Sequence, residues 1–291
     1  AGDIEALTEI LGGAIPRAAG MELIIVPDGP LYSVPWAALS SGDETWIDPG
    51  PISIADAPVV REAEDRGRPV RDLRLLALGV DGSPPARAAG LPALRSAERE
   101  AQEVSARWPR GNVTLSVGAS AGRSAFLGDQ LSEYDVIHIA SHAQAFQGLV
   151  DQTTLFVAGA TDAPVTASEI RRLPLNAELV FLSCCEAAGG IRRGVGPAHA
   201  GLARSFLEAG ARHVIASGIR VDDDAARELA VRFYEHWLDG VEISDALRMA
   251  QLDLREGRWA HPYYWAFYQV ISAYPPGGGA GGSGPVSQSE K

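Results

Sequence analysis

Two apolar runs in the sequence end in side chains that can take part in nucleophilic chemistry. The run over residues 135–143 leads into His142, and the run over residues 178–186 leads into Cys185. In parallel α/β sheets the carboxyl ends of the strands are where sites are built, so two neighbouring strands would bring these side chains together. A cysteine nucleophile needs a nearby imidazole, which favours the thiolate and protonates the leaving amine. The pair therefore predicts thiol-based nucleophilic catalysis.

Each of these residues also has a purely structural interpretation. A cysteine at the end of a strand is often a small buried hydrophobe, and one histidine among six can simply belong to the core. The separation of His142 and Cys185 favours the catalytic interpretation, because it is close to the spacing of about 50 residues found in caspases. His138 precedes His142 on the same strand face, but no further His, Cys or carboxylate joins it in a ligand pattern. We therefore expect His138 to be structural and the protein to hold no metal.

The elements that must position the pair follow from hydrophobic periodicity. Short apolar runs bounded by Gly, Pro or Asp alternate with stretches whose apolar residues are three and four apart. The runs expected as strands are 22–26, 73–80, 113–117, 136–140, 178–182 and 213–217, and those expected as helices are 94–108, 198–209, 223–238 and 243–255. This alternation predicts an α/β fold with a mostly parallel central sheet and helices on both faces.

Composition excludes several classes of function. The chain of 291 residues has a formal net charge of -12, whereas proteins that bind nucleic acid or anionic membranes present a basic face. No apolar run approaches the length of a membrane span, and no signal segment opens the chain. The only two cysteines are the neighbours Cys184 and Cys185, which cannot join distant parts of the chain by a disulfide. Together with the predominance of Arg over Lys, this is typical of a bacterial, cytoplasmic protein.

Three segments differ in composition. Residues 1–20 are expected to form a helical lead-in, and residues 21–274 to form the main domain. Residues 275–291 consist largely of Pro, Gly, Ser and Ala, which cannot bury enough surface to offset the entropy of ordering, so a flexible tail is predicted. Because the chain begins with Ala1 rather than Met, we expect a regulatory region to precede it in a longer protein.

Several ordered blocks of sequence are spread over residues 20–274. Two of them are His138-Ile139-Ala140-Ser141-His142 and Leu182-Ser183-Cys184-Cys185-Glu186, and the others lie at 25–29, 35–39, 201–211, 221–225, 246–251 and 261–266. Taken together, these blocks resemble the CHAT family, a group of caspase-like bacterial domains often found beside tetratricopeptide repeats. Several blocks in the right order are far more specific than a lone His-Cys pair.

The resemblance implies a caspase-like α/β sandwich with the chemistry of a cysteine endopeptidase. His142 takes the place of the family's catalytic histidine. Cys185 takes the place of the nucleophile, because Cys184 falls where the family usually carries Ala. The backbone N–H groups of Cys185 and of Ala143, the residue after the histidine, would hold the oxyanion. Ala143 stands where the family often has Gly, but the backbone donor survives this change.

Other departures from the family pattern fall where a substrate or activation loop would lie. A Gly-Glu-Gly element reads Gly-Val-Gly over residues 194–196, and a Trp-Pro pair reads Ile219-Arg220. The residues expected to line the pocket for the substrate side chain before the scissile bond are Glu186, Arg220, Asp222 and Asp223. Arg220 would favour an acidic substrate residue and the carboxylates a basic one, and the acidic surplus favours a basic or uncharged residue. Asp223 is also expected to cap the helix that begins there.

The function predicted from these residues and from the resemblance is that of a caspase-like cysteine endopeptidase, a regulated effector of bacterial defence or cell death. Its partners would be a protein substrate and an upstream regulatory repeat domain, with no cofactor, nucleic acid or membrane. A different hypothesis, a catalytically silent caspase-like scaffold or switch, needs the same fold, but such modules usually lose one member of the pair. A small-molecule binding domain would need a phosphate or cofactor fingerprint, and the Gly-rich stretch over residues 194–201 does not supply one.

Overall fold

The computed structural model describes most of the chain between residues 19 and 273. The described residues are 6, 8, 10, 19–27, 31–32, 34–41, 44–55, 68–144, 150–159, 163–186 and 198–273. Cys185 and Glu186 are described through their backbone alone. The predicted tail over residues 275–291 lies outside the described residues, as does most of the predicted lead-in over residues 1–20.

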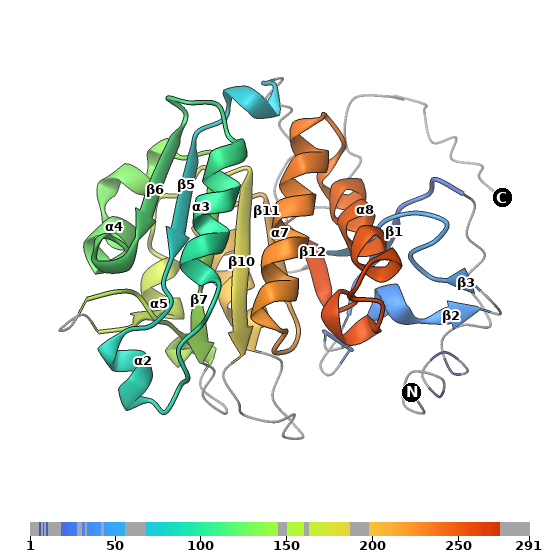
Figure 1. Ribbon diagram of the computed structural model, residues 1–291, viewed down its shortest axis with the longest axis horizontal. Coiled ribbons are helices and arrows are strands. Elements are labelled where there is room, and N and C mark those ends of the chain that lie inside the picture. The colour runs from blue at the N-terminus through green and yellow to red at the C-terminus, as the bar shows by residue number, and fades with distance from the viewer. Residues whose placement is uncertain are drawn as a thin grey trace, which may run out of the picture.

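The described elements alternate between strands and helices along most of the chain (Figure 1). The strands are β1 (Leu23–Ile25), β2 (Ser40–Ser41), β3 (Glu44–Thr45), β4 (Ile52–Ala55), β5 (Leu75–Gly79), β6 (Val113–Val117), β7 (Val136–Gln144), β8 (Thr154–Leu155), β9 (Val165–Thr166), β10 (Leu179–Glu186), β11 (His213–Ser217) and β12 (Tyr268–Ser272). The helices are α2 (Pro84–Ala88), α3 (Ala97–Arg107), α4 (Arg123–Leu127), α5 (Ala167–Ile170), α6 (Ala198–Ala209), α7 (Asp223–Leu238) and α8 (Ile243–Glu256).

One large sheet organises the molecule, with the strand order β1-β4-β12-β11-β10-β7-β5-β6. The strands from β11 to β6 are all parallel to one another. β12 pairs antiparallel with β11, and β4 and β1 then run parallel to β12. The carboxyl ends of β5, β7, β10 and β11 therefore meet at one edge of the sheet, which is the edge where polar side chains follow the apolar runs.

Helices cover both faces of the sheet. α3, α7 and α8 lie side by side on one face (Figure 1), where they pack a core that includes Phe181, Phe233, Trp237 and Leu247. α5 and α6 pack on the other face around a second core that includes Leu182, Phe206 and Ile170. Because β7 and β10 are buried on both faces, their sequences are nearly continuous apolar runs. The predicted α/β class, with a mostly parallel sheet between helical layers, is confirmed.

Helix α3 approaches strand β5 unusually closely at Gly79. A Cβ atom at this position would lie 2.7 Å from the backbone oxygen of Ala97, 2.7 Å from Cα of Glu98 and 2.9 Å from Cβ of Ala101. Two of these three atoms are backbone atoms, which cannot rotate away. Glycine at the end of β5 therefore permits the distance at which α3 packs on the sheet.

The predicted elements agree with the observed ones at most positions, with two differences in the sheet. β7 and β10 continue past the apolar runs to Gln144 and Glu186, because their small polar residues stay paired in the ladder between the two strands. Four strands of the sheet, β4, β8, β9 and β12, were not expected. β4 and β12 pair with each other, and β8 pairs with β7 and β9. Among the described helices, none combines the length and the apolar character needed to cross a membrane.

Candidate active site

The parallel pairing of β7 with β10 places Cys185 beside His142. The register pairs Phe181 with His138, Ser183 with Ala140 and Cys185 with His142. Side chains alternate between the two faces along a strand. Positions 183 and 185 therefore share the face of Phe181, which packs against α7. The sequence prediction that two strand ends bring His142 and Cys185 together agrees with this backbone register.

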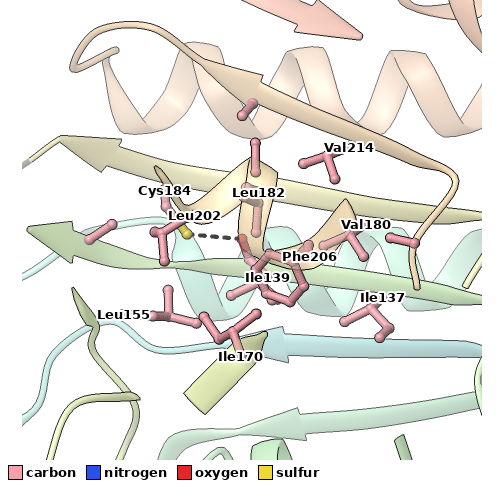
Figure 2. Packing of buried hydrophobic residues seen from close by; sticks show 14 of the residues in the cluster. Ile137, Ile139, Leu155, Ile170, Val180, Leu182, Cys184, Leu202, Phe206 and Val214 are labelled. Carbon is pink, nitrogen blue, oxygen red and sulfur yellow. Dashed lines mark hydrogen bonds between the residues drawn. The ribbon is translucent and has the colours of Figure 1, made fainter. Parts of the chain in front are cut away.

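Cys184 belongs to the opposite face of the sheet. Its side chain is buried in the core with Leu182, Leu202 and Phe206, and Sγ donates to the carbonyl of Ile139 at 3.6 Å (Figure 2). Burial in such apolar surroundings favours the protonated form of a thiol, which is unreactive. Of the two adjacent cysteines, Cys184 therefore lies in the hydrophobic core, away from the face that carries His142.

The imidazole of His142 is held by one backbone carbonyl. Its ring is buried, and Nε2 lies 2.6 Å from the carbonyl oxygen of Pro92. A carbonyl can only accept, so Nε2 carries the hydrogen and the neutral ring has its lone pair on Nδ1. Nδ1 is also buried and has no hydrogen-bond partner among the described residues. The ring is therefore oriented with a free proton acceptor.

The electrostatic surroundings keep this imidazole neutral. Burial is the largest influence and lowers the pKa of His142 below its usual value of 6.5, and the positive charge of Arg220 lowers it further. The hydrogen bond to Pro92 and the negative charge of Asp223 act in the opposite direction and offset part of the shift. A neutral imidazole near physiological pH is the form that can accept a proton from a thiol.

Three hydrogen bonds hold the segment that carries Pro92 in place. The N–H of Leu94 donates to the carbonyl of Asp81 at 2.6 Å. The N–H of Arg95 donates to Oδ2 of Asp223 at 3.0 Å, and the hydroxyl of Ser96 donates to Oδ1 of Asp224 at 2.8 Å. Since Asp223 and Asp224 form the first turn of α7, the position of the Pro92 carbonyl depends on that helix. Sequence reasoning missed Pro92, because a backbone carbonyl leaves no signal in residue type.

The residues predicted to line a specificity pocket lie in different environments. Asp222 is the N-cap of α7, where Oδ1 accepts from the N–H groups of Asp224 and Ala225 at 3.0 and 3.2 Å. The expectation that Asp223 caps this helix was wrong by one residue, because the cap must precede the first helical residue. Arg220 is exposed, and Glu186 pairs in register with Ala143.

Ala143 remains within β7, next to the histidine. Its register partners are Glu186 on β10 and Leu155 on β8. The proposed oxyanion donors, the backbone N–H groups of Ala143 and Cys185, therefore lie on adjacent strands at the same edge of the sheet. Their role stays a prediction.

A small cavity lies behind the pair, between the sheet and helices α3 and α7. Its volume is about 10 Å³, and its lining comprises Leu94, Ala97, Glu100, Ala140, Ser141, Ser183, Asp223 and Ala226. Ala140 and Ser183 are the residues two positions before His142 and Cys185 on the same strand faces. The cavity thus lies inward of the two candidate residues along the sheet, and His142 is not part of its described lining.

Glu100 and His138 form a buried polar pair next to this cavity. Nε2 of His138 lies 3.2 Å from Oε1 of Glu100, and both side chains are almost entirely buried. The hydroxyl of Tyr234 lies 3.4 Å from Nδ1 of the same histidine. The predicted structural role of His138 agrees with this burial. Among the described residues, no group of three His, Cys, Asp or Glu side chains is arranged to hold a metal ion.

Comparison with known families identifies the chain. A family model described as the CHAT domain matches residues 3–273. The chain belongs to the CHAT domain family. No curated protein gives a significant sequence match. The resemblance derived from the ordered blocks around His142 and Cys185 is therefore confirmed at the level of the family.

Two solved structures of gingipain R share the fold of this CHAT domain. One is the crystal structure of the Arg specific cysteine proteinase gingipain R, with a TM-score of 0.55 and 9% identity, covering 94% of this chain and 67% of that chain. The other is a complex of the pro- and mature domains of Porphyromonas gingivalis RgpB, with a TM-score of 0.54 and 10% identity, covering 94% and 68%. At these identities the likeness shows the fold alone, and the predicted caspase-like α/β class is confirmed.

Proposed function

We propose that this CHAT domain is a cysteine endopeptidase in which Cys185 is the nucleophile and His142 is the general base and acid. The observation that carries the proposal is the geometry of His142. Its register partner is Cys185, its Nε2 is held by Pro92, and its Nδ1 is buried without a partner among the described residues. A proton acceptor oriented beside a thiol is the arrangement that activates a cysteine.

The reaction follows from these groups without a cofactor. Nδ1 of His142 takes the thiol proton of Cys185, and the sulfur attacks the carbonyl carbon of the peptide bond. The imidazolium returns this proton to the leaving amine as the C–N bond breaks, which leaves a thioester on Cys185. Water then attacks the thioester, with the imidazole again accepting a proton, and the thiol and a carboxylic acid product are released. The backbone N–H groups of Cys185 and Ala143 would hold the oxyanion in both steps.

The substrate we propose is a protein cleaved after a basic or uncharged residue. Supporting this preference are the negative charge of Asp223, which acts on His142 and lines the nearby cavity, and the acidic residues Glu186 and Asp222, which are close to the candidate site in the sequence. Arg220 is the one residue of this group that would favour an acidic substrate. The context proposed for this activity is a regulated bacterial defence or cell-death system in the cytoplasm, with an upstream repeat domain as the regulator.

A cleavage screen tests the proposal directly. The protein is incubated with the proteins encoded beside it and with a cell extract, and new amino termini are identified by mass spectrometry. Cys185→Ala is the blank, and Cys184→Ala is the matched control, because Cys184 lies in the core on the opposite face. His142→Ala should lose as much activity as Cys185→Ala, because the two groups act as a unit.

The outcome separates the protease from the silent scaffold. Cleavage that needs Cys185 and His142 and survives the loss of Cys184 supports the protease. Equal products from all four proteins would show that the cleavage comes from another enzyme, and the scaffold hypothesis would then take its place.

A further inference from the structure

Ser96 occupies the N-cap position of α3 without capping that helix. Its side chain makes no capping hydrogen bond, although serine at this position commonly accepts from a backbone N–H of the first turn. Oδ1 of Asp81 accepts from the N–H of Glu98 at 2.8 Å instead. The buried hydroxyl of Ser96 donates to Oδ1 of Asp224 on α7 at 2.8 Å. Ser96 therefore connects two helices rather than stabilising the start of its own.

The segment that ends at Ser96 is the one that orients His142. Its Pro92 carbonyl accepts from Nε2 of the imidazole at 2.6 Å. At the other end of the segment, Leu91 is buried against Ala86 and Phe156. Apolar contacts have no preferred direction, whereas hydrogen bonds do. The direction of the Pro92 carbonyl is therefore set mainly by the hydrogen bonds that join the segment to α7.

We propose that Ser96 and Asp224 are positioning residues for the reaction, because their hydrogen bond keeps the Pro92 carbonyl on Nε2 of His142. With the hydrogen fixed on Nε2, the lone pair stays on Nδ1, where it can accept the thiol proton. Both residues act through Pro92 and not on the substrate. The proposal rests on the proposed function, which makes His142 the proton acceptor for Cys185.

The contribution of Asp224 can be separated from that of the charges nearer to the imidazole. The charged residues that influence the pKa of His142 are Asp223 and Arg220. The side chain of Asp224 is 56% exposed, so solvent and salt screen its charge. The hydrogen bond to Ser96 is consequently its connection to the site, and this bond can be removed from the serine side without changing any charge.

The tautomer of His142 reports its position without a substrate. Nitrogen NMR of protein carrying isotope-labelled histidine shows which ring nitrogen bears the hydrogen, and the spectrum of His142→Gln identifies the signals of this ring. At mildly alkaline pH we expect the hydrogen on Nε2 alone in the unmodified protein. Ser96→Ala and Asp224→Ala should give a mixture of tautomers, because the carbonyl is no longer held against Nε2. Asp224→Asn keeps an oxygen that can accept from Ser96 and should restore the single tautomer.

Acyl transfer measures the consequence for the chemistry. The probe is p-nitrophenyl acetate: the sulfur of Cys185 attacks its carbonyl carbon, the thiol proton passes to His142 and then to solvent, and p-nitrophenolate leaves a thioester behind. Cys185→Ala is the blank. His142→Ala should lower the rate by about a hundredfold or more, which is the usual loss of a general base. Ser96→Ala and Asp224→Ala should each lower it by about tenfold, because the histidine is present but misplaced.

A double variant tests whether the two residues act through one bond. Ser96→Ala and Asp224→Ala remove the same hydrogen bond, so the protein carrying both substitutions should lose no more activity than either single variant. Asp224→Asn should react at close to the rate of the unmodified protein. Additive losses would show that the two residues act separately and would overturn the proposal.

Asp245→Ala is the matched control for loss of charge at the start of a helix. Asp245 lies in the first turn of α8 and 3.7 Å from Arg248, as Asp224 lies in the first turn of α7 and 3.9 Å from Arg227. α8 begins beyond the far end of α7 (Figure 1), about 20 Å along that helix from Asp224. Asp245→Ala should therefore change neither the tautomer nor the rate. Thermal unfolding shows that each variant is folded.

The failures of the two proposals differ. A single tautomer and an unchanged rate in Ser96→Ala would overturn the positioning role, while a slow His142→Ala would leave the proposed function standing. Equal effects of Asp224→Asn, Asp224→Ala and Asp245→Ala would assign the change to helix charge and overturn the positioning role as well. If Cys185→Ala and His142→Ala release p-nitrophenolate as fast as the unmodified protein, the proposed function fails, and the positioning role fails with it.

Discussion

Replacing Gly79 by alanine should damage both the fold and the site. The added Cβ would meet the backbone of α3 at 2.7 Å, at the oxygen of Ala97 and at Cα of Glu98. Carbon atoms pack at about 3.5–4.0 Å, so the helix must move away from β5 by close to 1 Å. Overpacking of this kind costs about 1–3 kcal/mol in the free energy of unfolding. In a chain of this size each kcal/mol lowers the melting temperature by about 2–4 °C.

The same displacement should lower activity. α3 begins directly after the segment whose Pro92 carbonyl holds Nε2 of His142. A misplacement of about 1 Å in a catalytic group can cost roughly a hundredfold in rate. We therefore expect Gly79→Ala to reduce the rate of peptide cleavage at temperatures where the protein is fully folded, with the melting temperature measured on the same sample.

Gly82→Ala is the control for this experiment. The nearest atoms to a Cβ at this position lie 3.8 Å away, which is an ordinary van der Waals distance. This variant should unfold within about 1 kcal/mol of the unmodified protein, because alanine also reduces the entropy of the unfolded chain. If Gly79→Ala were as stable and as active as Gly82→Ala, the close approach of α3 to β5 would not set the position of the site.

Three further predictions concern titration and packing. Burial, with the nearby charge of Arg212, lowers the pKa of His213 to about 4, so below pH 6.5 the unfolded chain takes up a proton that the folded protein does not. The free energy of unfolding should therefore fall by up to about 3 kcal/mol between pH 6.5 and 4. His213→Asn should remove this pH dependence, as measured by urea titrations. Asp223→Asn should lower the pKa of His142 and Arg220→Ala should raise it, because their charges act on the imidazole in opposite directions. If NMR titration of the ring protons showed the pKa of His142 moving in the same direction in both variants, this electrostatic account would be contradicted. Cys184→Ala should destabilise the fold by about 1 kcal/mol through the loss of buried sulfur, while Cys184→Asp, which buries an unpaired charge, should prevent folding as judged by circular dichroism.

The part of the candidate site that lies at strand ends can be predicted from the sequence. His142 and Cys185 follow long apolar runs, and such runs in a parallel sheet end at a common edge, so their proximity can be expected from periodicity. Pro92 could not be expected in this way. Its contribution is a carbonyl oxygen, which every residue carries, and it reaches His142 only because the loop after β5 is folded back against α7.

The cavity could not be predicted from the sequence either. It exists because Ala97, Ala140 and Ala226, from three separate elements, leave space where they meet. Alanine is common in helices and strands alike, so its presence at these positions carries no signal before the elements are packed. The expected pocket residues are charged residues that follow Cys185 directly or follow the neighbouring strand at its carboxyl end, and of these only Asp223 lies in the described lining.

The acidic start of α7 has a consequence for how this region can change. Asp222, Asp223 and Asp224 follow one another, yet the first caps the helix, the second accepts from Arg95 and the third from Ser96. Successive residues of a helix point about 100° apart, so each carboxylate faces a different neighbour and none can replace another. Insertion or deletion of a single residue here would rotate the three carboxylates together around the helix axis. The negative charge at the start of the helix would remain, but the hydrogen bonds to Arg95 and Ser96, which hold the loop beside His142, would be lost. Alignments that treat these aspartates as interchangeable would overlook such a change, although it would uncouple the helix from the site.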